Sequence, residues 1–167
     1  MRMKRYIYFV LLLAATTSCK KSDLDIVEKF VQEVKADKGD PPNSLPDFQI
    51  DDIEALLKHA KDDQIVSRYP RPPHSSLFGE PVEVGFVMLY AIESILQQKE
   101  WPYLGIGVLD GLDFRIRVPL SEVLPFYQSW WATNKGKSAE EIRKTHPLAG
   151  SGLTWHGIPI TDINFYR

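Results

Sequence analysis

The sequence predicts a single, mainly α-helical globular domain of four or five helices around a central buried helix, with a minor β-hairpin. The first observation is an apolar segment, 81–100, with helical spacing. The second is a set of amphipathic segments on both sides of it. The third is one stretch, 103–118, in which apolar and polar residues alternate. A chain of 167 residues is long enough for one domain with its own core.

The first 19 residues have the features of a secretory leader. MRMKR is basic, YIYFVLLLAA is an apolar run of ten residues, and ATTSC ends in the only cysteine of the chain. Because ten apolar residues are too few for a transmembrane helix, the segment predicts a signal peptide. The ending Thr17-Ser18-Cys19 resembles a lipobox, the cleavage site of bacterial lipoproteins, with Thr16 in the place of the usual Leu.

The lipobox resemblance implies a signal peptide over 1–18, lipidation of the Cys19 thiol, a tether over 19–23 and one globular domain over 24–167. Three acyl chains bind a membrane far more firmly than one. Lys20 stands where inner-membrane lipoproteins carry Asp, which favours the outer membrane, with the domain in the periplasm or at the surface. The alternatives are an ordinary secreted protein with a free cysteine near its start and an uncleaved anchor.

The charge balance does not favour a nucleic-acid partner. Loss of the three leader cations changes the formal charge from −2 to about −5. The remaining basic residues form no stripe, and the only KK pair lies beside the expected anchor.

Two amphipathic helices are expected before the central one. In 23–36, apolar residues share one face, and Ser22 and Asp25 have capping-box spacing. That face consists of Leu24, Val27, Phe30, Val31 and Val34. In DDIEALLKHAKD, 51–62, acidic residues begin a second helix, as the helix dipole favours.

The segment 81–100 is expected to be the central helix. Pro81 suits a first helical turn, and apolar residues recur every three or four positions. The uncharged part spans about nine residues, well short of the roughly 20 that cross a bilayer. The sequence therefore predicts a buried helix rather than a membrane span.

The segment 103–118 alternates around Asp110-Gly111, a common hairpin turn. Its apolar positions are Leu104, Ile106, Val108, Phe114, Ile116 and Val118. Two strands alone are marginally stable, so the hairpin is expected to lie on helices or to pair with a third strand from 153–160.

Two more helices are expected in the last third of the chain. One begins at Pro119 and stops at Gly136, with Pro125 dividing it into a turn and a longer helix. Ser138 and Glu141 have capping-box spacing and predict a short helix through residue 144. The Gly- and Pro-rich tail is expected to wrap the domain.

The sequence contains no recognisable catalytic or metal-binding motif. His59, His74, His146 and His156 lack metal-ligand spacing, and neither GxSxG nor CxxC occurs. GIGVLDG lacks the GK[ST] ending of a phosphate-binding loop. No catalytic residue, metal or cofactor is therefore predicted.

Three acidic residues in the middle of the chain are candidate acids or bases. Asp110 and Asp113 are interpreted as turn residues rather than as an acid–base pair. Glu93 interrupts the apolar part of the central helix, where a carboxylate is costly unless paired. Arg115 and Arg117, with Arg68, are its expected partners in a structural ion pair, and catalysis by Glu93 is the alternative.

Two regions are candidate binding sites. Trp130 and Trp131 point about 100° apart on a helix, so one of them is expected to be exposed and able to contact a sugar or a partner. Packing of both beneath the tail is the alternative. Arg68, Tyr69 and Arg71 lie in a proline-rich segment that is either a binding loop or a surface loop.

Several stretches together resemble a family of small lipoproteins of unknown function from anaerobic Gram-negative gut-type bacteria. They are the relaxed lipobox, DIEALLKHA, a tyrosine–proline loop followed by SS, AIESI, FYQSWW and HPLAGSGLTWHG. The resemblance covers most of the chain after the leader. It implies one periplasmic or surface domain on a lipid anchor, with no assigned activity and no functional residues to transfer.

The expected function is that of a non-enzymatic, membrane-anchored binding or accessory module of the cell envelope, with a protein or glycan partner. One alternative is an envelope enzyme acting on glycan or cell-wall substrate through Glu93 or the aspartate pair. Another is an immunity-type protein that neutralises an envelope toxin.

Overall fold

The computed structural model describes residues 23–38, 44–71, 80–103, 105–113 and 115–157. The expected signal peptide and the lipidation site Cys19 lie outside the described residues. So do most of the expected tether, part of the proline-rich loop, His74, and the hairpin positions Leu104 and Phe114.

The described residues contain five α-helices and two small antiparallel sheets, which confirms a mainly α fold with a minor β component. The helices are α1 (Asp23–Ala36), α2 (Ile53–His59), α3 (Val84–Gln97), α4 (Leu120–Asn134) and α5 (Ala139–Arg143), with a 3-10 turn η1 (Ile50–Asp52) before α2. Strand β1 (Ile65–Val66) pairs with β2 (Val82–Glu83), and β3 (Val108–Asp110) pairs with β4 (Leu153–Trp155).

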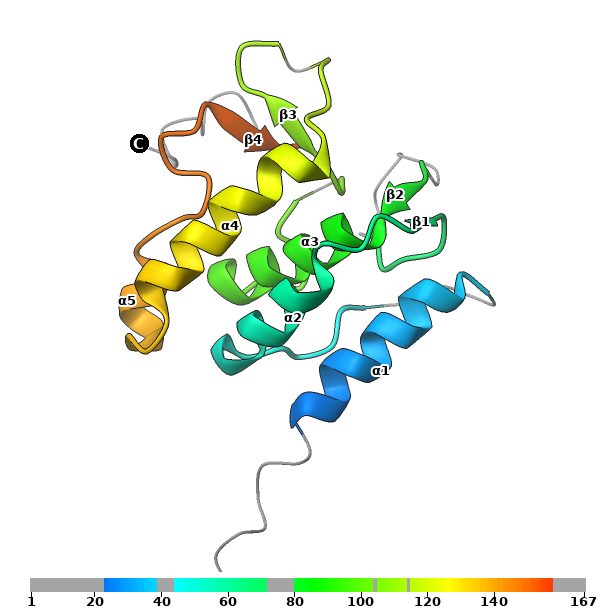
Figure 1. Cartoon of the computed structure of the whole chain (residues 1–167), viewed down its shortest axis with the longest axis horizontal. Coiled ribbons are helices and arrows are strands. Elements are labelled where there is room, and N and C mark those ends of the chain that lie inside the picture. The colour runs from blue at the N-terminus through cyan, green and yellow to red at the C-terminus, as the bar shows by residue number, and fades with distance from the viewer. Residues whose placement is uncertain (1–22, 39–43, 72–79, 104, 114, 158–167) are drawn as a thin grey trace, which may run out of the picture.

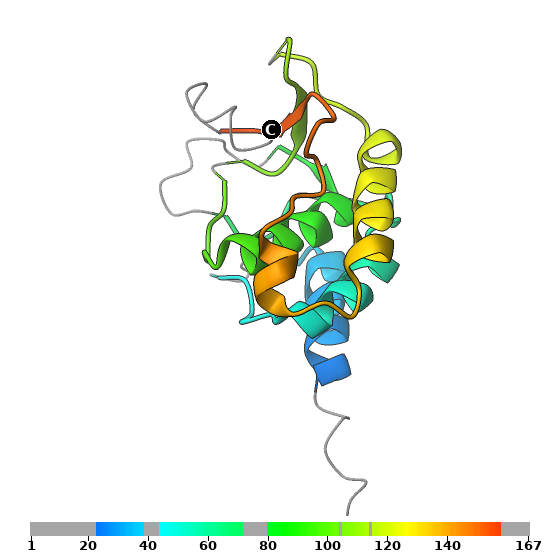
Figure 2. The same ribbon diagram turned by 90° about the vertical axis from the view of Figure 1, so that its left-hand side faces the viewer.

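Helix α3 is the centre of the domain, as expected. Helices α1 and α2 cover one side of it, and α4 and α5 cover the other (Figures 1 and 2). Ten consecutive residues of α3, from Val84 to Glu93, are buried. In the part of the chain that the structure describes, no helix has both the length and the hydropathy needed to cross a membrane.

Helices α1 and α2 agree with the sequence prediction. Helix α1 has the predicted bounds and buries Val27, Phe30, Val31 and Val34. The ring of Phe30 meets the ring of Phe48 edge to face, with centroids 5.3 Å apart. Because this apolar face packs on α2 and α3, it is not available to a membrane surface.

Gly85 allows α3 to approach its neighbours closely. A Cβ atom there would lie 2.3 Å from the carbonyl oxygen of Ala60 and 2.4 Å from a methyl carbon of Leu120. A side chain at this position would therefore push apart α3, the end of α2 and the start of α4.

The predicted start of the central helix at Pro81 is wrong. Residues 82–83 instead form β2, and α3 begins at Val84. The first amides of α3 explain this start: the N–H of Val84 donates to the carbonyl of Gln64 at 2.9 Å, and that of Gly85 donates to Asp62 at 2.9 Å. Pairing with the 62–66 segment thus satisfies backbone donors that the start of a helix leaves free.

The predicted hairpin is only partly present. Strand β3 pairs with β4, so the expected third strand is the main partner. The expected second strand is reduced to a bridge between Leu109 and Arg117. Ile116, predicted to face inward, is 52% exposed. The turn is wider than two residues because Asp110 and Asp113 each accept a backbone hydrogen bond from the residue two positions further on.

Helix α4 is continuous through Pro125, contrary to the predicted division. Pro125 removes a single backbone hydrogen bond near the start of α4. This part of the helix is exposed, so water can reach the carbonyl that loses its partner. The capping box of α5 is confirmed. The N–H of Ser138 donates to the Glu141 carboxylate at 3.0 Å, and the N–H of Glu141 donates to Ser138 Oγ at 3.3 Å.

Candidate functional site

Glu93 is the centre of a closed polar cluster. Its side chain is fully buried. Tyr127 donates its hydroxyl to Glu93 Oε1 at 2.5 Å, and Tyr103 donates to Oε2 at 2.9 Å. His146 Nε2 lies 2.8 Å from Oε2, and Gln97 Nε2 lies 3.3 Å from it. Glu93 on α3 thus joins α4, the connection after α3 and the segment after α5.

The backbone around His146 directs Nε2 toward Glu93. The N–H of Leu148 lies 3.1 Å from Nδ1, so a neutral ring carries its hydrogen on Nε2, and Nε2 donates to Glu93 whether the ring is neutral or charged. Helix α5 turns the chain back so that the histidine reaches α3, 53 positions earlier in the sequence.

Trp155 closes the cluster on the side of β4. Its indole N–H donates to the Tyr127 hydroxyl at 2.9 Å. Its ring stacks on Tyr103 at 5.4 Å and meets Tyr90 edge to face at 5.8 Å. Only 1% of Trp155 is exposed. Aromatic rings therefore exclude water from the carboxylate.

The Glu93 carboxyl is held as an anion. Burial by itself raises its pKa, but the attraction of the His146 ring, the hydrogen bond of that ring and those of the two tyrosine hydroxyls outweigh burial. The pKa of Glu93 therefore lies below its ordinary value. A buried anion with this many donors stabilises the fold, but it offers no face to a substrate.

The prediction that arginines pair with Glu93 is wrong. His146 is its partner instead. Arg115 pairs instead with Asp113 at 3.0 Å. Arg117 donates to the carbonyl of Ile106 at 2.6 Å, and its guanidinium lies 3.8 Å from Glu80. The pairing of Asp113 and the turn hydrogen bonds of Asp110 and Asp113 agree with their interpretation as turn residues.

The two adjacent tryptophans of α4 differ in burial. Trp130 is 8% exposed, and its indole N–H donates to Thr145 Oγ1 at 2.8 Å. Trp131 is half-buried and packs against the edge of the core. Of the two, Trp131 has the larger surface available to a partner, so the binding role predicted for this pair stays a prediction.

The described start of the proline-rich loop is fixed to the domain. Tyr69 is buried and donates its hydroxyl to the carbonyl of Glu80 at 2.9 Å. The guanidinium of Arg71 lies over the Tyr69 ring, 4.4 Å from its centre. Arg68 is exposed, and its backbone N–H donates to Asp37 at 2.7 Å. A binding role for these residues also stays a prediction.

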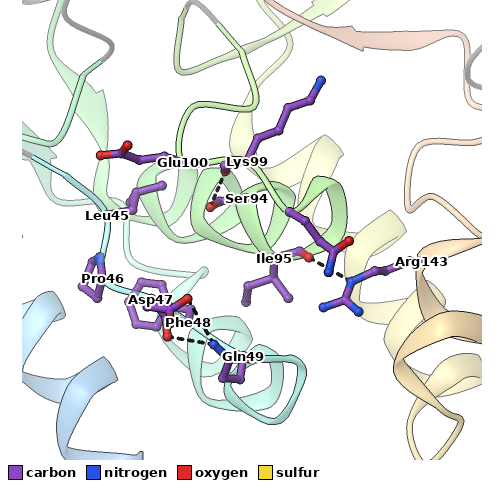
Figure 3. A pocket seen from close by; sticks show the side chains of 11 residues that line it. Leu45, Pro46, Asp47, Phe48, Gln49, Ser94, Ile95, Lys99, Glu100 and Arg143 are labelled. Atoms are coloured by element: carbon purple, nitrogen blue, oxygen red, sulfur yellow. Dashed lines mark hydrogen bonds between the residues drawn. The ribbon is translucent and has the colours of Figure 1, made fainter.

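A groove of about 360 Å³ opens beside the C-terminal end of α3 (Figure 3). Leu45, Pro46 and Phe48 form one side, and Arg143 of α5 lies on the other (Figure 3). Ile95 contributes to the floor between them. The remaining lining residues are Asp47, Gln49, Ser94, Gln98, Lys99 and Glu100.

Sequence reasoning missed both the role of His146 and the groove. His146 was considered only as a metal ligand, and its partner is distant in the sequence. The groove combines three separate segments, none of which carries a binding motif. Among the described residues, no group of three or more His, Cys, Asp or Glu side chains could hold a metal ion.

Comparison with known proteins identifies the family but no activity. No curated protein and no solved structure matches the chain. Residues 21–156 match a family described as a domain of unknown function, DUF4943. Because this match covers most of the chain, including all five helices described above, the protein belongs to the DUF4943 family.

Proposed function

We propose that this protein is a lipid-anchored, non-enzymatic binding module of the cell envelope, held at the outer membrane through Cys19. Its partner is an envelope protein or glycan. Two features support it: the lipoprotein-like leader of the sequence, and the burial and pairing of the candidate catalytic acids in the folded domain.

The observation that carries the proposal is the closure of the Glu93 cluster. An acid–base catalyst must reach the proton that it transfers. Glu93 is fully buried, and its oxygens accept hydrogen bonds from Tyr103, Tyr127 and His146. Asp113, from the other candidate acid pair, is engaged with Arg115. The groove beside α3, in contrast, is open to solvent and has a mixed apolar and charged lining, as ligand sites commonly do.

The position of α1 is consistent with an anchor at the N-terminus. In both ribbon views, the start of α1 and the β3–β4 sheet lie at opposite ends of the domain (Figures 1 and 2). A membrane anchor before α1 would therefore leave the β3–β4 end, including Leu112, facing away from the bilayer. Leu112 is 96% exposed.

The anchor is tested with the full chain and its Cys19→Ser variant, expressed in a Gram-negative host with radiolabelled palmitate. We expect label and outer-membrane fractionation for the wild-type chain, and loss of both in the variant. A Ser18→Ala variant is the matched control, because it keeps the thiol. Unlabelled wild-type chain, or a Cys19→Ser variant that keeps its label, would contradict the anchor.

The non-enzymatic part is tested separately by incubating the wild-type chain with purified cell-wall glycan. We expect no release of soluble fragments. Release that is abolished by Glu93→Gln, with the fold intact by circular dichroism, would overturn this part of the proposal.

A further inference from the structure

We infer that the groove beside α3 binds the carboxyl end of a peptide whose last side chain is apolar. This inference rests on the proposed binding function and names the class of its partner, a protein with an accessible C-terminal segment. The groove belongs to none of the interactions that hold the Glu93 cluster together.

Arg143 is placed to receive a carboxylate. Its Nε donates to the carbonyl of Ile95 at 3.3 Å, which turns the guanidinium toward the groove (Figure 3). No carboxylate among the described residues pairs with Arg143, whereas Lys144 beside it pairs with Glu140 at 2.7 Å. The two terminal nitrogens of Arg143 are therefore available for a paired hydrogen bond to a carboxylate. Such charge-assisted pairs are stronger than hydrogen bonds between neutral groups.

The groove offers a small apolar surface. Leu45, Phe48 and Ile95 line it, and each is packed mostly in the core, with 7%, 7% and 4% of its surface exposed. They face the groove from two separate segments (Figure 3). Acidic Asp47 lies on the side across from Arg143 (Figure 3), where a peptide whose carboxylate is at Arg143 would bring its N–H groups.

Gln98 is the third observation. It ends α3 in the left-handed conformation, with φ 52° and ψ 42°. Glycine occupies such a position at lower cost, because any Cβ atom is strained there. Gln98 also lines the groove, where its carboxamide can both donate and accept a hydrogen bond. An amide is the natural partner of a peptide backbone.

The inference is tested by titrating the full chain, in detergent micelles, with acetyl-Gly-Leu that has a free carboxylate. Ligand-observed NMR gives the dissociation constant. We expect saturable binding, with affinity at least tenfold lower for the C-terminal amide of the same peptide. The free acid 4-methylpentanoate has the same apolar group and carboxylate but no peptide N–H, and we expect it to bind at least tenfold more weakly than the peptide.

Two variants locate the site. Arg143→Gln is expected to lower the affinity for the free peptide at least tenfold. Lys144→Gln, which removes the same charge at the next residue, should leave that affinity within twofold of wild type. Gln98→Gly is expected to raise the melting temperature of the chain and to lower its affinity for the peptide. Because this variant relieves backbone strain, its lost affinity cannot be attributed to unfolding.

The inference would be overturned by the absence of saturable binding or by an unchanged affinity in Arg143→Gln. Equal affinities for the free peptide and its amide, or for the free peptide and 4-methylpentanoate, would also overturn it. Palmitate labelling of the same preparation is independent of the groove. Failure of the peptide to bind the labelled chain therefore rejects the ligand and leaves the anchor intact.

Discussion

The two sides of α3 are held by different physical means. Toward α1 and α2, apolar side chains and one glycine make the contact, as Phe30, Leu56 and Gly85 illustrate. Toward α4 and the C-terminal segment, the contact includes a buried carboxylate and its donors. The first side tolerates changes of similar volume, whereas the second depends on every polar partner, since an unpaired group in the interior is costly.

The largest expected effect is on the polar side. Glu93→Ala leaves two tyrosine hydroxyls and His146 without their shared acceptor, in addition to a cavity. We expect the free energy of unfolding to fall by about 3–5 kcal/mol, measured by urea denaturation of the full chain. Glu33→Ala, on the exposed face of α1, is the control and should change it by at most about 0.5 kcal/mol. A comparable small loss for Glu93→Ala would show that the cluster does not hold this side together.

The close approach of α3 to the end of α2 and the start of α4 is tested by Gly85→Ala. The added methyl group meets a backbone oxygen and Leu120 at less than 2.5 Å. We expect a loss of about 1–3 kcal/mol from overpacking, seen as a lower melting temperature. Helix propensity alone favours alanine by about 1 kcal/mol, so a stabilised variant would mean that the close approach at Gly85 is not required.

The pH dependence of stability should follow the polar side. The folded pKa of Glu93 lies below its unfolded value of 4.5, so the folded state binds fewer protons in this range. Its stabilising contribution is complete above that value and is lost as the pH falls through the folded pKa.

The pH effect is measured by urea denaturation of wild-type chain and Glu93→Gln between pH 6 and pH 3. Lys35 lowers the pKa of Asp62, and Arg115 lowers that of Asp113, so both chains lose some stability in acid. We expect the wild-type chain to lose more, by up to about 1.4 kcal/mol per pH unit for one group. Parallel curves for the two chains would contradict a depressed pKa at Glu93.

The smallest expected effect is at an exposed ion pair in the loop after β3. Arg115→Ala removes the pair with Asp113, in which the arginine side chain is 91% exposed. We expect no measurable change in urea denaturation, because water already solvates both groups. A loss near that of Glu93→Ala would remove the contrast between buried and exposed carboxylates.

The same comparison explains how much the sequence predicts. Helices α1 and α2 were predicted because their apolar faces repeat at helical spacing, and this signal is local. The partner of Glu93 was not predicted, because His146 lies 53 positions later in the sequence and reaches Glu93 only through the packing of α4 and α5. Pro81 was misjudged for a related reason: the amides that begin α3 bind carbonyls of the 62–64 segment, which no local rule includes.

The groove was beyond prediction on similar grounds. Each of its segments has an ordinary local role: Phe48 packs on α1, Gln98 ends α3 and Arg143 lies in a short capped helix. Only their meeting in the folded chain creates a site. The burial of Glu93 follows from its place in an apolar helix, which is where burial and charge conflict most strongly. Its structural role stays a prediction.

The most direct test of the structural role of Glu93 is its own titration. The carboxyl carbon of Glu93 can be followed by NMR in the full chain, labelled at glutamate and held in detergent micelles, with Glu93→Gln used for assignment. The structure predicts a midpoint below 4.5 and an anion throughout the neutral range. A midpoint near neutrality would contradict this account, because a carboxyl that exchanges its proton there is suited to acid–base catalysis.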